Sequence, residues 1–439
     1  MNQLLIINGT IINSDSTSNS DIAVSEGLIT EIGILNPSEF PDYKIIDAKG
    51  KYIFPGGIDP HVHLELPTPA GPSCDDFLSG SKAAISGGTT FLIDFVTPSR
   101  GQSLMKALAF RLKESNKCLV DYTLHMGITW YDEAIPEQME WCVNEVGIKS
   151  FKAYLAYKGS IGIEYRELEQ VMKKAASLNA IVLVHCEEGD VIVQNQKQFI
   201  SDGKTEPLYH ALSRPAEVES ESVRKVIELC RKTKCKTYIV HTSTAKSIDY
   251  IRAAKKEGLP LFCETCPQYL LLDESVYSKP LPDSLKYVIS PPIRSKLDQE
   301  SLWLALADGT VDVISTDHCP FNTKGQKDVG INDFTKIPNG AGGIENRLAL
   351  LYTYGVLTKK ISLEQFVGLT STNAARIFEL YPQKGAVEVG SDADLLILNP
   401  KPKSVISLKT QVQQCDSNIY EGMSINGKAE FIVRNGEIL

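Results

Sequence analysis

The sequence predicts an α/β protein in which a (β/α)8 TIM barrel carries a small β-sandwich domain built from both termini. Two observations lead to this fold. Eight short apolar runs alternate with helical patterns through the middle of the 439-residue chain, whereas both of its ends hold only short strand-like segments. Apolar strands that alternate with helices are typical of a parallel sheet buried on both faces. Eight such repeats favour a closed barrel over an open, doubly wound sheet.

The two ends of the chain share one pattern. Alternating apolar and polar residues fill 4–13, 21–33 and 43–54, interrupted by Asn-Gly, Glu-Gly and Lys-Gly pairs that are typical of hairpin turns. Residues 392–400 and 424–439 repeat the pattern with further Asn-Gly turns. We therefore expect the two ends to pair into one β-sandwich domain.

The central part of the chain supplies the barrel. The expected boundaries are 1–53 and 386–439 for the two parts of the sandwich and 54–385 for the barrel. The expected barrel strands lie in the runs 52–59, 89–95, 121–127, 147–154, 180–185, 236–241, 259–264 and 311–316. Helical patterns stand between several of them, at 165–179, 221–232 and 243–258.

Metal-ligating residue types recur at the ends of these apolar runs. Six candidates share this placement: His61, His63, Lys152, His185, His241 and Asp317. In a (β/α)8 barrel the carboxyl ends of the strands form one mouth, where active sites lie. The pattern therefore predicts that all six side chains converge on one site.

The residue types in this set suit a divalent cation. The His61-Val62-His63 segment puts two imidazoles on one side of an extended strand, because side chains alternate in direction. Four histidines and one aspartate suit Zn²⁺ or a similar ion. They exceed the three protein ligands usual for one catalytic zinc, so we expect two metals.

The residue types alone do not explain how Lys152 could bind a metal. Two cations would repel an ammonium group, so an unmodified lysine should not bind there. A lysine at a strand end can simply be solvated or ion-paired. A neutral amine that captured CO2 would instead form a carbamate, an anionic ligand able to bridge two metals. The residue pattern leaves both interpretations open.

Composition limits the partners of the protein. The formal net charge of −9 argues against binding to nucleic acid. No run approaches the roughly 20 apolar residues of a membrane span, and the first residues do not resemble a signal peptide. Ten cysteines without a repeating spacing indicate reduced thiols, so we expect a cytoplasmic protein that acts on a small molecule. A redox or zinc-ribbon function for Cys263 and Cys266 is disfavoured, because no second cysteine pair has suitable spacing.

Seven motifs in the sequence resemble those of the dihydropyrimidinase/hydantoinase branch of the cyclic amidohydrolase superfamily. These motifs are GGIDPHVH, SFKAYLAYKG, VHCEEGD, VHTSTA, ISPPIR, STDHCPF and PNGAGGIENR. The resemblance extends from about Leu4 to Ile432. It implies two Zn²⁺ ions per subunit, held by the six candidates and bridged by an N6-carboxylated Lys152.

The same resemblance implies roles for three further residues. Tyr157 would donate a hydrogen bond to the substrate carbonyl oxygen, while Ser290 and Asn339 would hold the imide of the ring through main-chain groups. Without the family resemblance, Tyr157 could equally be an aromatic residue of the core, and Ser290 and Asn339 could be turn residues.

The implied activity is the opening of the ring amide of dihydrouracil, dihydrothymine or 5-substituted hydantoins, as in pyrimidine degradation. An activated hydroxide would attack the carbonyl, and Asp317 would act as the base. Two alternatives remain: a dihydroorotase- or allantoinase-like enzyme, and a non-catalytic scaffold. Dihydroorotases typically place an arginine two residues after the second histidine, where this chain has Glu65, so we expect a neutral ring. A homotetramer is expected, or a dimer because the chain ends soon after its last strand.

The segment 66–77, rich in proline, departs from the family pattern. We expect it to form a loop that faces the substrate, although its sequence does not predict which side chains line the site.

Overall fold

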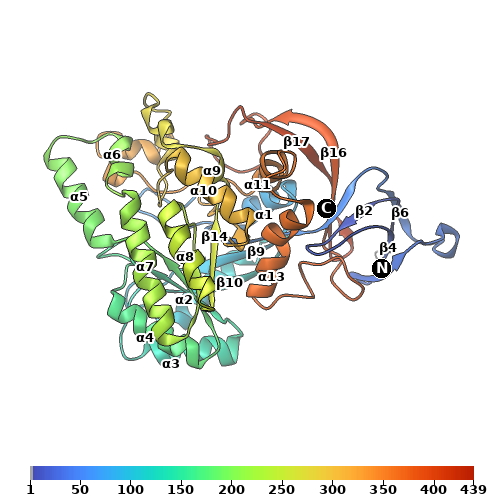
Figure 1. The fold of residues 1–439 in the computed structure, drawn as a ribbon, viewed down its shortest axis with the longest axis horizontal. Coiled ribbons are helices and arrows are strands. Elements are labelled where there is room, and N and C mark those ends of the chain that lie inside the picture. The colour runs from blue at the N-terminus through green and yellow to red at the C-terminus, as the bar shows by residue number, and fades with distance from the viewer. Residues whose placement is uncertain (1–2) are drawn as a thin grey trace.

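The computed structural model describes residues 3–439 and has two parts (Figure 1). A barrel surrounded by helices forms the larger part, and a smaller β-rich part stands beside it. The N- and C-terminal ends both lie at the smaller part. This arrangement confirms the predicted fold class. No helix within residues 3–439 is long and apolar enough to cross a membrane.

Eight parallel strands form the barrel in sequence order. They are β8 (Gly57–Val62), β9 (Thr89–Val96), β10 (Asp121–Ile128), β11 (Ser150–Tyr154), β12 (Ile181–His185), β13 (Lys236–Ile239), β14 (Leu261–Thr265) and β15 (Val313–Ile314). The last strand returns to the first through a parallel bridge between Val62 and His318. The His63 amide donates to the His318 carbonyl at 2.8 Å there and closes the ring.

Each of the eight expected runs overlaps one of these strands, but the first run is divided. Its beginning is β7 (Tyr52–Pro55), which pairs with strands of the smaller part, and β8 begins after Gly56. At Gly56 a Cβ atom would come within 2.0 Å of the Thr90 side chain, so only glycine allows this close approach.

Helices cover the outside of the barrel (Figure 1). Residues 165–179, 221–232 and 243–258 were each expected to be helical, and each lies largely in a helix. The helices are α1 (Phe77–Ser86), α2 (Leu104–Ser115), α3 (Ile135–Trp141), α4 (Tyr165–Ser177), α5 (Gly189–Ser201), α6 (Pro207–Leu212), α7 (Ala216–Thr233), α8 (Ala245–Lys256), α9 (Pro267–Leu271), α10 (Lys296–Ala307), α11 (Arg347–Leu351), α12 (Leu363–Val367) and α13 (Asn373–Ile377).

Alternation along β12 shows how the barrel strands are packed. Val182 and Val184 belong to the apolar layer between strands and helices, whereas Ile181 and Leu183 belong to a separate inner cluster. Because side chains alternate with period 2, His185 at the end of β12 lies on the inner side. The same alternation in β11 puts Lys152 opposite to Phe151 and Ala153, which pack in the outer layer.

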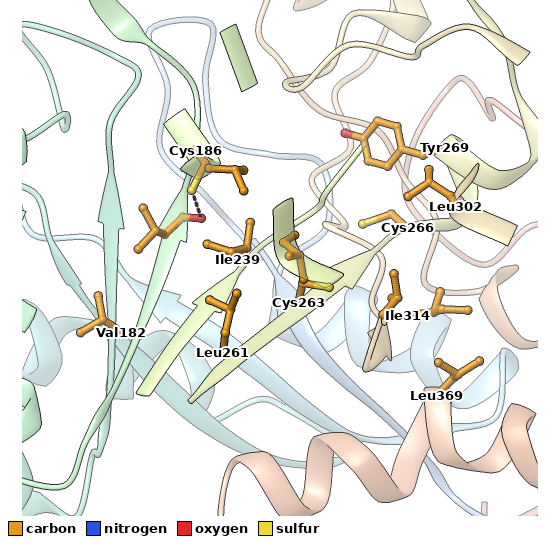
Figure 2. Close-up of a cluster of buried hydrophobic side chains, with 14 of the residues drawn as sticks. Val182, Cys186, Ile239, Leu261, Cys263, Cys266, Tyr269, Leu302, Ile314 and Leu369 are labelled. Carbon is orange, nitrogen blue, oxygen red and sulfur yellow. Dashed lines mark hydrogen bonds between the residues drawn. The ribbon is translucent and has the colours of Figure 1, made fainter. Parts of the chain in front are cut away.

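Cys263 and Cys266 lie in this outer apolar layer, beside Leu302 and Ile314 (Figure 2). All ten cysteines of the chain are free, and these two are buried. Both thiols pack against apolar side chains, and the one group of potential metal ligands found within residues 3–439 does not include them.

The smaller part consists of two sheets with the orders β5-β4-β1-β6 and β18-β17-β16-β7-β2-β3. Their strands are β1 (Leu4–Ile7), β2 (Thr10–Ile12), β3 (Thr17–Asn19), β4 (Asp21–Ser25), β5 (Leu28–Gly33), β6 (Lys44–Asp47), β7, β16 (Leu395–Val405), β17 (Ser424–Arg434) and β18 (Glu437–Ile438). Side chains from both ends of the chain, such as Ile6 and Val433, share one core.

Only some of the expected hairpin turns are present. Glu26-Gly27 joins β4 to β5 and Asn435-Gly436 joins β17 to β18, with all four residues at positive φ. The Asn8-Gly9 pair is different, because the strands on its two sides enter different sheets. The hairpin predicted there is wrong, and so is the one at the Lys49-Gly50 pair, for the same reason.

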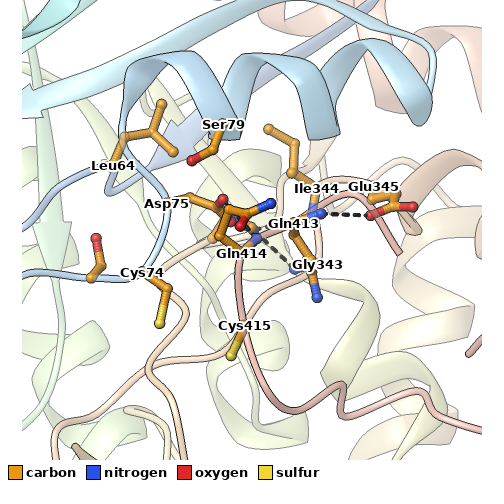
Figure 3. A network of polar contacts seen from close by, with 12 residues as sticks. Leu64, Cys74, Asp75, Ser79, Gly343, Ile344, Glu345, Gln413, Gln414 and Cys415 are labelled. Carbon is orange, nitrogen blue, oxygen red and sulfur yellow. Dashed lines mark hydrogen bonds and ion pairs between the residues drawn. The ribbon is translucent and has the colours of Figure 1, made fainter. Parts of the chain in front are cut away.

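A segment near the C-terminus returns to the mouth of the barrel (Figure 3). The Gln414 amide donates to Asp75 Oδ1 at 2.9 Å, while Asp75 Oδ2 lies 3.0 Å from His318 Nε2. Glu345 Oε2 accepts from the amides of Val412 and Gln413. Asp75 thus holds the loop after β8 against the C-terminal segment and against His318, which follows β15.

Candidate active site

Three of the predicted ligands meet at the junction of β8 and the segment after β15. His61 is in β8, His63 follows it, and Asp317 follows β15 after Ser315 and Thr316. The Nε2 atoms of His61 and His63 are 3.2 Å apart, and each is 3.2 Å from Asp317 Oδ1. Ligand atoms of these three residues all lie within 4.8 Å of one another.

The other three predicted ligands belong to the next part of the same mouth. His185 ends β12, His241 follows β13 after Val240, and their ring centroids are 4.6 Å apart. The ring of His241 is also 5.5 Å from that of His61. Lys152 lies within β11, and not at its end as the sequence suggested. All six residues nevertheless line one cavity.

Two buried carboxylates orient the imidazoles. Glu264 accepts a hydrogen bond from His61 Nδ1, and Glu187 Oε2 lies 2.7 Å from His185 Nε2. Each contact leaves the other ring nitrogen of that histidine free for a ligand, an arrangement common among metal-binding histidines. Neither acid was expected at the site from the sequence. Their position offered a signal, because Glu187 follows His185 by two residues and Glu264 lies in an apolar strand.

Burial keeps these histidines neutral. It lowers the pKa of His61 and of His241 well below the ordinary value, and it also lowers the pKa of His185. For Asp317, burial acts to raise the pKa, but the neighbouring His61 and His63 outweigh it and the net pKa is lowered. His61, His185 and His241 are therefore neutral and Asp317 is a carboxylate at neutral pH, which are the protonation states that bind metals.

The donor set fits a divalent cation. Because His61 Nδ1 donates to Glu264, its Nε2 carries no proton and can bind a cation. It lies 3.2 Å from His63 Nε2, and both atoms lie 3.2 Å from Asp317 Oδ1, so a cation placed between the three could bind all of them. Zinc bonds of 2.0–2.1 Å in tetrahedral geometry place ligand atoms about 3.3 Å apart. The buried Nδ1 of His241 also has no partner among residues 3–439.

Lys152 is an amine in an unusual position. Its side chain is buried, and its Nζ lies 5.1 Å and 5.2 Å from the ring centroids of Phe95 and Tyr154. No carboxylate within residues 3–439 forms an ion pair with it. Burial lowers the pKa of Lys152 to about 8. A substantial fraction of this amine is therefore neutral near physiological pH.

Three residues of the cavity have backbone conformations that non-glycine residues rarely adopt. Tyr157 has φ of 59°, His241 has 37° and Asp317 has 52°. Such conformations cost about 1–3 kcal/mol each and persist only where the surrounding structure enforces them. The strain therefore gathers on residues that the sequence had assigned to chemistry.

The cavity has a volume of about 640 Å³, which is enough for a small ring. Its floor carries the six predicted ligands, and Tyr157, Ser290 and Asn339 line the same space. Residues 66–70, from the loop expected to face the substrate, line part of this cavity. Burial raises the pKa of Tyr157 to about 12, which leaves its phenol protonated and able to donate.

Comparison with known proteins agrees with this geometry. The model of the amidohydrolase family matches residues 52–439. The chain belongs to the amidohydrolase family. It is 42% identical over 436 residues to a D-hydantoinase of Geobacillus stearothermophilus, covering 99% of this chain and 92% of that protein. It is 40% identical to a dihydropyrimidinase of Arabidopsis thaliana, covering 100% of this chain and 82% of that one.

Solved structures give the same result. A dihydropyrimidinase from Brevibacillus agri superposes with a TM-score of 0.98 at 40% identity, covering 99% of this chain and 94% of that one. An L-hydantoinase from Arthrobacter aurescens has a TM-score of 0.89 at 26% identity, covering 100% and 96%. This amidohydrolase therefore lies in the dihydropyrimidinase/hydantoinase branch, as its motifs predicted.

One expectation about the amidohydrolase site is wrong. Glu65 was expected to meet the substrate, but it is absent from the cavity lining and its carboxylate lies 3.0 Å from Lys117 Nζ. The residue has φ of 52°, so the chain turns sharply there and directs the side chain away from the metal ligands. Glu65 therefore cannot explain a preference for neutral rings.

The three remaining histidines of the amidohydrolase have partners inside the protein. His125 contacts the Ser150 hydroxyl, His318 contacts Asp75, and His210 Nε2 lies 2.8 Å from the Ile289 carbonyl oxygen. None of the three lines the cavity.

Proposed function

We propose that this amidohydrolase opens the ring amide of 5,6-dihydropyrimidines, such as dihydrouracil and dihydrothymine, and of 5-substituted hydantoins. One observation carries the proposal: the candidate metal ligands and a protonated Tyr157 line one cavity that is large enough for such a ring. The names of the relatives, D-hydantoinase and dihydropyrimidinase, support this substrate class.

The proposed cofactor is a pair of Zn²⁺ ions bridged by N6-carboxylated Lys152. The ligands would be His61, His63, Lys152, His185, His241 and Asp317. The neutral imidazoles and the lowered pKa of Lys152 support this assignment, because a carbamate forms only from a neutral amine. When bound, the metals would polarise the amide carbonyl and make a water molecule acidic near neutral pH.

Each of the other site residues would then have a separate role in the reaction. Asp317 would accept the proton of the attacking water and pass it to the ring nitrogen as the C–N bond breaks. The Tyr157 phenol would donate to the carbonyl oxygen, where negative charge develops. Main-chain groups of Ser290 and Asn339 would hold the rest of the imide.

The lining of the cavity favours a neutral ring over dihydroorotate. A substrate carboxylate is usually met by arginine, whose two parallel donors match it. No arginine of residues 3–439 lines the cavity, and the Lys336 ammonium at its edge is paired with Asp333 at 3.2 Å. This observation replaces Glu65 as the argument against the dihydroorotase alternative.

Steady-state rates on dihydrouracil, dihydrothymine, hydantoin and 5-phenylhydantoin test the proposal, with dihydroorotate and allantoin as competitors. We expect kcat/KM for at least one neutral ring to exceed that for dihydroorotate by about a hundredfold or more. A faster rate on dihydroorotate would overturn the substrate class. Measurement of the metal content distinguishes an enzyme from a non-catalytic scaffold. We expect about two zinc ions per chain for the enzyme and none for a scaffold.

We also propose that the protein is a homotetramer in the cytoplasm, with a dimer as the alternative. Light scattering coupled to size exclusion measures the assembly directly. A monomer at micromolar concentration would refute this part of the proposal and leave the activity untouched.

A further inference from the structure

Two buried basic side chains stand behind the wall of the cavity that contains Ser290 and Asn339. His210 and Lys327 are each 1% exposed, and neither lines the cavity itself. Lys327 has no carboxylate partner within residues 3–439, although isolated buried ammonium groups are costly. Both residues instead direct their N–H groups at main-chain carbonyls.

Lys327 connects two loops. Its Nζ donates to the Val288 carbonyl at 2.9 Å and to the Pro338 carbonyl at 3.0 Å. The Gly340 amide donates to the same Val288 carbonyl at 3.1 Å. The Lys327 Nζ group thus joins the segment that leads into Ser290 to the segment that contains Asn339.

His210 acts on the first of these segments alone. Its Nε2 lies 2.8 Å from the Ile289 carbonyl oxygen and 3.4 Å from Ser290 Oγ. Burial lowers the pKa of His210 to about 3, so the ring is neutral and has a single N–H. Because the Ile289 oxygen can only accept, that hydrogen is on Nε2.

The carbonyl groups that accept from His210 and Lys327 fix the direction of two N–H groups. The Ile289 carbonyl shares a peptide plane with the Ser290 N–H, and the Pro338 carbonyl shares one with the Asn339 N–H. Both peptide bonds are trans, so in each plane the N–H points away from the carbonyl. Neither N–H has an acceptor among residues 3–439.

We infer that His210 and Lys327 are positioning residues that turn the amides of Ser290 and Asn339 toward the substrate. By holding the carbonyls on the far side of the cavity wall, they direct the paired N–H groups to the inner side, where Ser290 and Asn339 line the cavity. The inference rests on the proposed function for the identity of the substrate. The orientation of the two peptide planes does not depend on it.

The decisive variants remove the donors without leaving a buried charge. Lys327→Met and His210→Leu eliminate the hydrogen bonds to the carbonyls, whereas His210→Gln keeps an N–H of similar reach. Lys324→Met is the matched control, because this exposed lysine lies in the same loop and outside the cavity lining.

We expect KM for dihydrouracil or hydantoin to rise about tenfold in Lys327→Met and in His210→Leu, as for the loss of one well-made hydrogen bond. The value of kcat should stay within about threefold and bound zinc should not change, because no ligand is touched. His210→Gln should recover most of the affinity. An unchanged KM in a folded Lys327→Met protein would overturn the inference, as would a loss of zinc with a fall in kcat alone.

Amide hydrogen exchange without substrate separates this inference from the proposed function. Exchange in segments 286–292 and 336–341 should be faster in Lys327→Met than in the wild type or in Lys324→Met. If Lys327→Met does not fold, the same comparison of His210→Leu with His210→Gln decides the matter. Unchanged exchange in the variants would refute the positioning role even for an active enzyme. A wild type inactive on every ring would refute the proposed function alone.

Discussion

The Nε2 atoms of His61 and His63 lie 3.2 Å apart, and both face the carboxylate of Asp317. A cation between these three atoms could bind all of them at once, so metal binding should contribute to the stability of the fold.

Chelation should destabilise the folded protein. A ligand present at about 1,000 times its Kd adds about 4 kcal/mol to the free energy of unfolding, which for a chain of this length shifts Tm by about 4 °C. We expect Tm to fall by at least this amount after dialysis against a strong chelator and to recover with added zinc. Differential scanning calorimetry measures the shift. Equal Tm values for both forms would show that the cluster does not bind metal tightly.

Asp317→Asn should abolish turnover while much of the metal remains. The substitution removes the proposed proton acceptor but leaves the four imidazoles in place, so we expect kcat to fall at least about a thousandfold. Asp308→Asn, on the exposed side of the barrel, is the control for handling and stability. Steady-state kinetics and metal analysis on the same samples measure both effects. Near-normal rates in Asp317→Asn would remove this residue from the role of base.

The strand pattern and the convergence of the candidate ligands on one cavity could be predicted because both depend on patterns that are local in the sequence. A single apolar run that ends in His or Asp, such as the one before His185, predicts both a strand and a candidate ligand at the end of that strand. The contacts of Glu264, Lys327 and His210 could not be predicted in this way, because their partners lie far along the chain and loop conformation brings them together.

Glu65 shows the converse error. It is a neighbour of the ligand His63 in sequence, and proximity in sequence suggested proximity in the site. A backbone at φ of 52° turns it toward Lys117 instead. Residues beside a ligand cannot be assigned to the substrate until the backbone between them is known.

Formation of the lysine carbamate should depend on pH. Burial lowers the pKa of Lys152 from 10.5 to about 8. At pH 7.5 about a quarter of the amine is then neutral, compared with about one part in a thousand at the ordinary pKa. Because only the neutral amine captures CO2, metal-free protein given zinc and a fixed concentration of dissolved CO2 should regain activity faster as pH rises from 6 to 8.

The carbamate itself can be followed with ¹³C-labelled CO2 by NMR, using Lys152→Gln as the control that should show no signal. Recovery at a rate independent of pH across this range would contradict the expected titration. A labelled carbamate in the Lys152→Gln protein would place the modification on a different amine.

Tyr157→Phe should lower kcat and leave the metal centre intact. The phenol lines the cavity 5.2 Å from the ring of His185, measured between centroids, and has no assigned part in metal binding. Removal of one donor to a developing oxyanion costs about 10²–10³ in kcat. Because burial raises the pKa of Tyr157 to about 12, the donor stays protonated, and the pH profile of the wild type should show no loss of activity from this residue between pH 6 and 10. Tyr43→Phe in the sandwich part is the matched control. A Tyr157→Phe enzyme with unchanged kcat would assign the stabilisation of the oxyanion to the metal ions and the main chain alone.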